Sequence, residues 1–184
     1  KIALSYPDTY ELGMSNMALP ILYELLNSQP DALAERVFAP WVDMEAAMRA
    51  TRTPLLSLET GHLLKDFDII GFSLGYELTY TNVLNMLDLA GIPVLASERN
   101  DSHPIVIAGG SSAHNPEPMA DFIDFFVIGE AEEVLPKLIS RFQAWKRKGE
   151  RASKKELLRQ VATIDGIYVP SLYQVEYQSD GLFK

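Results

Sequence analysis

Short apolar runs alternate with amphipathic stretches along almost the whole chain. Compact apolar runs bounded by Gly, Pro or Asp are typical of buried strands, whereas apolar residues three and four positions apart are typical of helices. The first pattern predicts strands at Ile2–Tyr6, Arg36–Phe38, Phe67–Leu74, Ile105–Ala108 and Phe125–Ile128. The second pattern predicts helices at Met17–Leu26, Asp43–Ala50, Thr79–Ala90, Ala131–Trp145 and Glu156–Val161. Two shorter apolar runs are also expected to be extended: Leu55–Leu58 as a short strand or loop, and Val94–Ser97 as a short strand.

The alternation of these elements predicts the fold class. Strands that are apolar at almost every position are buried on both faces, which is typical of a parallel sheet with helices on each side. Right-handed crossovers then produce a doubly wound sheet. We therefore expect a three-layer α/β/α fold of the Rossmann-like or flavodoxin-like kind.

Several residues are expected to end or cap these helices. Ser15 or Asn16 can cap the helix at Met17–Leu26, and Asp43 can cap the next helix. Gly91 stands where a helix C-terminus requires a left-handed residue, and Pro93 follows it. Side chains expected to serve as core packing are Met14, Met17, Met44, Met48 and Met86, together with Phe38 and Trp41.

The composition changes near residue 146. The stretch at 146–155 reads K-R-K-G-E-R-A-S-K-K and is typical of a solvated linker or a frayed helix end. We expect an α/β domain at 1–148, and a linker with an extended tail at 149–184. Gly166–Pro170 is expected to be extended, with a hairpin turn at Asp180-Gly181. Because Lys1 already lies within an apolar run, the chain is expected to be part of a longer polypeptide with a further domain downstream.

Composition and charge exclude several classes of protein. The 184 residues are 47% hydrophobic and 22% charged, with a formal net charge of −9, so electrostatic binding of nucleic acid is disfavoured. The chain contains no cysteine, which excludes disulfides, thiolate nucleophiles and iron–sulfur ligation by this chain. No apolar run reaches the roughly 18–20 residues that span a bilayer. We expect no membrane partner and a cytoplasmic location.

Polar and glycine-rich turns follow four of the predicted strands. Because the carboxyl ends of parallel strands share one edge, these turns are expected to form a ligand-binding rim. They lie at 8–13, 73–82, 109–116 and 129–133. Glycines at 109, 110 and 129 allow a planar or phosphate-bearing ligand to approach the backbone. The alternative is that each turn needs its glycines and hydroxyls only for turn geometry and helix capping.

No catalytic constellation is recognisable. Neither the dinucleotide G-x-G-x-x-G pattern nor the P-loop follows any predicted strand, and no histidine–carboxylate cluster has metal-ligand spacing. His62 and His103 are expected at the surface, whereas His114 lies on the predicted rim. The glutamates that open the last long helix are explained by its dipole. We expect no catalytic or metal-ligating residue here, and a free-standing small-molecule enzyme is disfavoured.

The turns together resemble a known family. The run Asp8-Thr9-Tyr10-Glu11-Leu12-Gly13 resembles the D-x-H-x-x-G loop of cobalamin-binding domains, with Tyr10 at the place of the cobalt-ligating histidine. Ser73 and Gly109-Gly110 match the later serine and Gly-Gly signatures. The segment Ile105–Glu133 is similar to the cobalamin-binding-like domain that precedes the barrel of radical S-adenosylmethionine (radical SAM) enzymes. Three sequence segments are similar to those of an uncharacterised subgroup of these Fe–S proteins: PDTYELGMSN, FAPWVDME and YELTYTNVLNMLDLAGIP.

The resemblance implies an accessory domain that presents cobalamin or a substrate to a downstream radical SAM barrel, with the substrate unknown. It implies that Asp8 orients its loop, that Ser73 and Thr79 donate hydrogen bonds to the cofactor's nucleotide tail, and that Gly109 and Gly110 line the tail's slot. The full set of implied cofactor-binding residues is Asp8, Tyr10, Gly13, Ser73, Gly75, Thr79, Gly109, Gly110, Ser111, His114, Gly129 and Glu130.

Two departures from the family pattern leave alternatives open. Without a histidine at position 10, this loop offers cobalt no imidazole, and Gly75 occupies the third place of the usual S-x-L. The family's [4Fe–4S] cluster and S-adenosylmethionine need a C-x-x-x-C-x-x-C loop, which is expected only in the downstream domain. This chain alone is therefore not expected to catalyse a reaction. A structural or docking module without a cofactor is the alternative interpretation.

Overall fold

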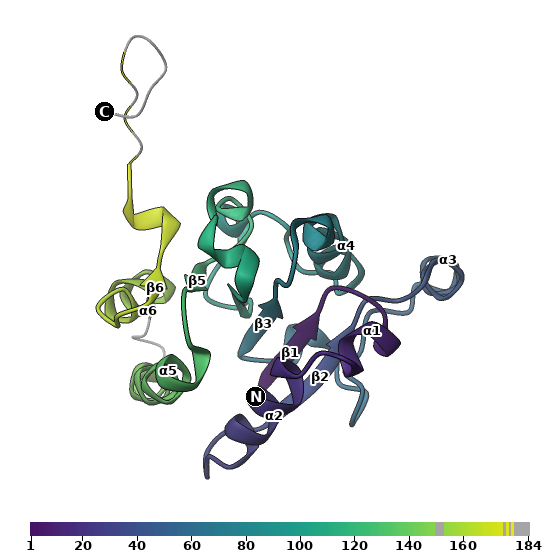
Figure 1. The fold of residues 1–184 in the computed structure, drawn as a ribbon, viewed down its shortest axis with the longest axis horizontal. Helices are drawn as coiled ribbons and strands as arrows, with labels where there is room; N and C mark the ends of the chain where they lie inside the picture. The colour runs from purple at the N-terminus through teal and green to yellow at the C-terminus, as the bar shows by residue number, and fades with distance from the viewer. Residues whose placement is uncertain (150–152, 175, 177, 179–184) are drawn as a thin grey trace.

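The computed structural model describes residues 1–149, 153–174, 176 and 178. Within these residues a single sheet has the strand order β2-β1-β3-β4-β5-β6 (Figure 1). The first five strands are parallel, and β6 pairs antiparallel with β5. The strands are β1 (Ile2–Tyr6), β2 (Ala34–Phe38), β3 (Ile69–Ser73), β4 (Ile105–Gly109), β5 (Phe125–Val127) and β6 (Ile167–Tyr168). This order is the flavodoxin-like one, in which the chain reverses its direction of winding between β1 and β3.

Helices connect the strands on both faces of the sheet. The α-helices are α1 (Tyr10–Met14), α2 (Ala18–Asn27), α3 (Val42–Thr51), α4 (Tyr80–Leu89), α5 (Ala131–Lys146) and α6 (Lys154–Val161). Short 3-10 turns are η1 (Leu64–Asp66), η2 (Glu77–Thr79), η3 (Ala96–Glu98), η4 (Ser111–His114), η5 (Glu117–Met119) and η7 (Pro170–Leu172). Each predicted long helix is present, with its bounds shifted by a few residues.

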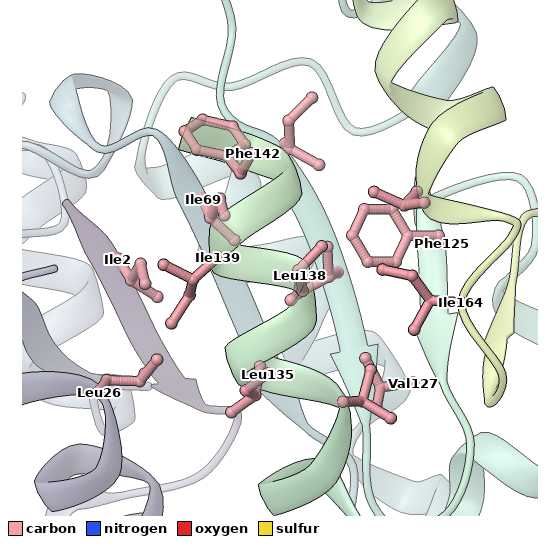
Figure 2. Close-up of a cluster of buried hydrophobic side chains, with 14 of the residues drawn as sticks. Ile2, Leu26, Ile69, Phe125, Val127, Leu135, Leu138, Ile139, Phe142 and Ile164 are labelled. Carbon is pink, nitrogen blue, oxygen red and sulfur yellow. The ribbon is translucent and has the colours of Figure 1, made fainter. Parts of the chain in front are cut away.

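Helices cover both faces of the sheet, so the sheet is buried on each side. Because neighbouring residues of a strand point to opposite faces, they pack in two different cores. Ile69 packs in one core with α2, α5 and α6, and Ile70 packs in the other core with α3 and α4. Figure 2 shows the first core, in which α5 lays Leu135, Leu138 and Ile139 across the strands. The three-layer α/β/α prediction is confirmed.

The segment after α5 also packs on the sheet. Leu157 and Val161 of α6 are fully buried in the core that α5 covers. The predicted extended run at Gly166–Pro170 contains β6, which covers the outer edge of β5. A domain boundary near residue 148 stays a prediction, and the hairpin at Asp180-Gly181 lies outside the described residues.

Two of the three expected helix caps are present. Asn16 Oδ1 accepts hydrogen bonds from the amides of Ala18 and Leu19 at 3.0 and 3.3 Å, so it caps α2. Gly91 has φ +68°, and the amide of Ile92 donates to the Leu87 carbonyl at 3.0 Å, which is the closure of a Schellman motif. The third expectation, an Asp43 cap, is wrong.

Trp41 precedes α3, which begins one residue ahead of Asp43. Asp43 therefore lies inside the first turn, where its Oδ1 accepts only the neighbouring amide of Met44. A carboxylate in a first turn still interacts favourably with the helix dipole, so the residue type suits the position without capping it.

The expected strand at Val94–Ser97 is absent from the described residues. Pro93 has no amide to donate, and the carbonyls of Pro93 and Val94 accept hydrogen bonds from the buried Arg99 guanidinium at 3.0 Å. Backbone groups already bonded to this side chain cannot pair with a strand. The other short run, Leu55–Leu58, is mostly loop, with Leu56 in an isolated antiparallel bridge to Leu63.

Several side chains expected in the core lie at the surface instead. Met48 and Met86 are buried as predicted. The exposed ones are Met14, Met17, Trp41 and Met44. All four follow β1 or β2 at the carboxyl edge of the sheet, where the short α1 and the outer α3 leave them uncovered. Helical spacing predicts which residues share a face, and it does not show whether another element covers that face.

Candidate functional site

The loops that follow β1 and β3 meet at the carboxyl edge of the sheet. The Tyr76 hydroxyl donates a hydrogen bond to Asp8 Oδ2 at 2.5 Å, and Asn82 Nδ2 donates to the Pro7 carbonyl at 2.9 Å. Asp8 Oδ1 also accepts the amide of Thr9 at 2.8 Å. These bonds fix the first loop of the predicted rim against the start of α4.

Hydrogen bonds also join the loop after β4 to the loop after β3. The amide of Leu74 donates to the Gly109 carbonyl at 2.7 Å, and Ser111 Oγ donates to the Gly75 carbonyl at 2.7 Å. Gly110 has φ +107°, and a Cβ atom there would lie 2.6 Å from the Leu74 carbonyl oxygen. Only glycine can pass the backbone so close, so this residue serves the contact between two loops.

A cavity of about 210 Å³ lies where these strand ends face α2 and α5; we call it the α2–α5 slot. Three strand side chains and two glycines form its floor: Leu4, Ile107, Val127, Gly71 and Gly109. Its walls are leucines of the two helices: Leu19, Leu22 and Leu135. Figure 2 shows Leu135 on α5 and Val127 on β5, which both line the slot. The slot is narrow and mainly apolar.

The mouth of the slot is polar and carries negative charge. Ser73, Gly129, Glu130 and Glu132 line it, and none of the described lining residues is basic. Glu130 is the residue before α5, and its side chain accepts no hydrogen bond from the first backbone amides of this 16-residue helix. A polar atom placed at this mouth can accept from those amides, while a full negative charge is repelled by the two carboxylates.

Five of the twelve candidate residues line the slot. They are Ser73, Gly109, Gly110, Gly129 and Glu130. Gly129 has φ +99° and open space around the position of a Cβ atom. The slot therefore brings together the candidates that follow β3, β4 and β5.

The other candidates do not line the slot. Thr79 is buried, and its hydroxyl donates to the Tyr76 carbonyl at 2.8 Å. His114 is exposed and contacts the Ser111 carbonyl at 3.2 Å. Gly75 and Ser111 bond each other, as described above.

Tyr10 and Gly13 of α1 both contact Phe38 at the end of β2. The Tyr10 ring meets Phe38 edge-on, with centroids 5.3 Å apart. A Cβ atom at Gly13 would lie 2.3 Å from the Phe38 ring. Gly13 therefore lets α1 lie directly on this ring, which holds Tyr10 beside β2 and half-exposed.

The walls and part of the floor of the slot were not predicted from the sequence. Leu19, Leu22 and Leu135 have the helical spacing of ordinary core residues, which gives no sign of a cavity beside them. Gly71 did carry a signal, because a glycine inside an apolar strand often marks the close approach of another group. A Cβ atom there would make ordinary contact with Ile107 at 3.5 Å, so the glycine leaves space without being forced by its backbone.

Two further properties of the described residues bear on function. They contain no group of three or more His, Cys, Asp and Glu residues arranged to hold a metal ion. No helix in the described part of the chain has the length and apolar character needed to cross a membrane.

A family model described as "Radical SAM proteins, N-terminal" matches residues 18–170. The chain belongs to this family. The matched range includes every strand after β1 and both helices that form the slot. The resemblance to radical SAM proteins is thereby confirmed. This chain is an N-terminal accessory domain of a radical SAM protein.

A curated relative supports the same placement. This radical SAM N-terminal domain is 28% identical over 144 residues to the uncharacterized protein MJ0966 of Methanocaldococcus jannaschii. The alignment covers 76% of this chain and 26% of the relative. The chain thus spans about a quarter of the length of the relative that it matches.

Proposed function

We propose that this domain holds the nucleotide tail of cobalamin in the α2–α5 slot and presents the corrin to a radical SAM catalytic domain of the same protein. The observation that carries the proposal is the slot itself. It opens at the carboxyl ends of parallel strands beside the point where winding reverses, and ligands of doubly wound folds bind there.

The shape and chemistry of the slot suit the base of the tail. A bicyclic aromatic base is flat and apolar, and a cavity of about 210 Å³ with leucine walls and an apolar floor admits it. Ser73 and the first amides of α5 lie at the mouth, where hydrogen-bond donors can meet the ribose oxygens of the tail. Because Glu130 and Glu132 repel a full negative charge, the phosphodiester of the tail would stay outside the mouth, in solvent. The corrin ring exceeds this volume, so it would lie outside the slot, above the strand ends.

The loop after β1 does not fit a cobalt-ligating role. Tyr10 takes the place of the histidine, and its ring packs edge-on against Phe38. Asp8, the residue that in the resemblance orients this loop, accepts its hydrogen bonds from Tyr76 and Thr9. We therefore propose that the domain binds cobalamin without a histidine side chain of this loop as a ligand to cobalt.

The chemistry of the whole protein would be divided between two domains. Cobalamin supplies methyl-transfer or electron-transfer chemistry at cobalt when it is bound. This chain would contribute position and the exclusion of water, through its apolar slot walls. Since it contains no cysteine, the [4Fe–4S] cluster and S-adenosylmethionine would be held by the catalytic domain.

A titration with hydroxocobalamin, followed by absorbance and calorimetry, tests the proposal. We expect saturable binding near one equivalent, with a spectrum that lacks histidine ligation. Ala131→Trp places an indole in the slot from the first turn of α5 and should weaken binding by roughly tenfold or more. Ala144→Trp lies on the same helix, exposed and away from the slot, and should bind as the unchanged chain does.

A second function is favoured by the bonds between the rim loops. Tyr76 with Asp8, and Ser111 with Gly75, hold the loops together without a ligand, as expected of a docking module that needs no cofactor. Failure of both this chain and the whole protein to bind cobalamin at high micromolar concentration would favour the docking module. Binding by the whole protein alone would mean that the catalytic domain completes the site.

A further inference from the structure

Helix α3 is poorly covered for a helix of a doubly wound fold. Met48 is its only buried residue, whereas Val42 and Met44 are 68% and 57% exposed. Trp41, which precedes the helix, is 64% exposed. Figure 1 shows α3 at the outer end of the molecule, far from α5 and α6. Apart from Met48, the apolar residues at the start of this helix are uncovered by the described part of the chain.

Met48 anchors α3 in the core that it shares with α4, and polar bonds hold the rest of the helix to the domain. The Arg49 guanidinium donates to Asp88 at 2.9 Å and to Asn85 at 2.6 Å, and both acceptors belong to α4. Asn85 also donates to Glu45 at 2.9 Å. These exposed bonds fix the position of α3 while leaving its apolar side uncovered, as a preformed binding surface requires.

A groove of about 800 Å³ runs along that uncovered side, between α1, α3 and the segment 53–58. We call it the α1–α3 groove. Aromatic, proline and aliphatic side chains form much of its lining: Tyr10, Phe38, Pro40, Trp41, Pro54 and Leu58. Glu11 and Asp43 are its charged residues, and none of its described lining residues is basic. The groove is thus apolar with a negative rim.

The α1–α3 groove opens at the same edge of the sheet as the α2–α5 slot. Two residues that line the groove show this: Tyr10 begins α1, the helix after β1, and Phe38 is the last residue of β2. Ala18, at the start of α2, lines the slot only a few residues after α1. A partner that covers the mouth of the slot can therefore reach the groove by extending over α1.

We infer that the α1–α3 groove is a docking surface for the radical SAM catalytic domain of the same protein. This inference rests on the proposed function, which sets that domain over the carboxyl edge. The family model is described as N-terminal, and the aligned region is about a quarter of the relative MJ0966, which leaves length in that relative for a further domain. An exposed apolar groove of this extent marks an interaction surface. The negative rim requires a partner face that is apolar with Lys or Arg at its border.

A photo-crosslinking amino acid at Met44 in the whole protein tests the inference. We expect a crosslink within one polypeptide, from position 44 to a peptide of the catalytic domain. The same group at Leu33, which is exposed at the opposite edge of the sheet, should give no such crosslink. Crosslinks between two copies, shown by mixing isotope-labelled and unlabelled protein, would overturn the inference in favour of a dimer. Absence of any crosslink from position 44 to the catalytic domain would also overturn it.

Substitution of the groove separates this inference from the slot proposal. Met44→Glu should leave the thermal unfolding and the cobalamin affinity of this chain unchanged, because Met44 lies outside both the core and the slot. In the whole protein it should speed proteolysis between the two domains several-fold, whereas Leu33→Glu should not. If Met44→Glu leaves that proteolysis unchanged, the groove is not a domain contact, whatever the outcome of the cobalamin titration.

Discussion

Tyr76 and Asp8 share a hydrogen bond of 2.5 Å although 68 positions separate them in the sequence. The bond joins the loop after β1 to the loop after β3, across the point where winding of the sheet reverses. Both residues belong to turns that the sequence assigned to one rim. Their contact shows that two predicted turns meet, and it also means that the Asp8 carboxylate is already bonded.

This contact predicts a stability that depends on alkaline pH. The hydrogen bond to Asp8 raises the pKa of Tyr76 from its ordinary 10.0 to about 12. Because the unfolded chain releases the phenol proton first, the contribution is fully present below about pH 10 and is lost as pH rises towards about 12. The difference in urea midpoint between the unchanged chain and Tyr76→Phe should therefore shrink over this range.

A second tyrosine provides the control for that measurement. Burial, followed by its hydrogen bond to Glu117, raises the pKa of Tyr168 to about 12. A tyrosinate absorbance titration should show one fewer high-pKa phenol in Tyr76→Phe, with that of Tyr168 retained. An unchanged titration in Tyr76→Phe would contradict the contact with Asp8.

Gly110 and Gly129 differ in what a methyl group would meet, and this predicts different costs. Both have positive φ, +107° and +99°, but only Gly110 would place a Cβ atom against backbone, 2.6 Å from Leu74. Gly110→Ala should lower the free energy of unfolding by about 2–3 kcal/mol. Gly129→Ala should cost about 1 kcal/mol, for its backbone conformation alone. Urea denaturation of both variants checks the order, and equal costs would argue against the close loop contact.

A buried carboxylate between two cations predicts an asymmetry between variants. Asp124 lies 2.8 Å from Lys154 Nζ and 3.3 Å from the Arg99 guanidinium, and it accepts the amide of Val106 at 2.8 Å. Asp124→Asn removes the carboxylate that both buried cations contact and should cost about 3–5 kcal/mol. Lys154→Met leaves Asp124 paired with Arg99 and should cost about 1–2 kcal/mol. Denaturant midpoints measure both, and the reverse order would contradict this reading of the cluster.

A buried hydroxyl predicts a stabilising substitution. Ser5 of β1 is completely buried, and its Oγ has no hydrogen-bond partner among the described residues. Ser5→Ala removes an unsatisfied polar group and should raise the free energy of unfolding by about 1 kcal/mol. Ser57 is also buried, but its hydroxyl donates to Glu35 at 2.6 Å, so Ser57→Ala should destabilise. Thermal unfolding compares the two, and a loss of stability in Ser5→Ala would show that its hydroxyl has a partner.

The sequence predicted the layers of the fold because the apolar pattern reports burial directly. The strand pattern of Phe67–Leu74 predicted β3 to within two residues at its start, and Asn16 and Gly91 predicted two helix ends from local chemistry. Arg99 shows where such reasoning fails. Its guanidinium binds the carbonyls that a strand at Val94–Ser97 would need, and no local pattern reveals that contact.

The candidate site was predicted in part for a similar reason. In a parallel sheet the topology alone places the turns after the strands at one edge. Ser73, Gly109 and Gly129 were therefore expected near one another, and they line the slot, whereas their role in binding stays a prediction. The leucines of the slot walls look like core residues, because a cavity depends on the spacing of whole helices rather than on residue type. Tyr10 illustrates the limit of a motif, since its contact with Phe38 depends on where β2 ends.

The α2–α5 slot has a consequence for the order of events during synthesis. Its lining extends from Leu4 to Leu135, so the cavity does not exist until the last of these residues has left the ribosome. At a synthesis rate of about 5–20 residues per second, α5 is completed several seconds after the first strands and only then covers them. During that interval the apolar floor at Ile107 and Val127 is open to chaperones and to water. A nascent chain stalled before α5 cannot retain any ligand of the slot, and one released after it can.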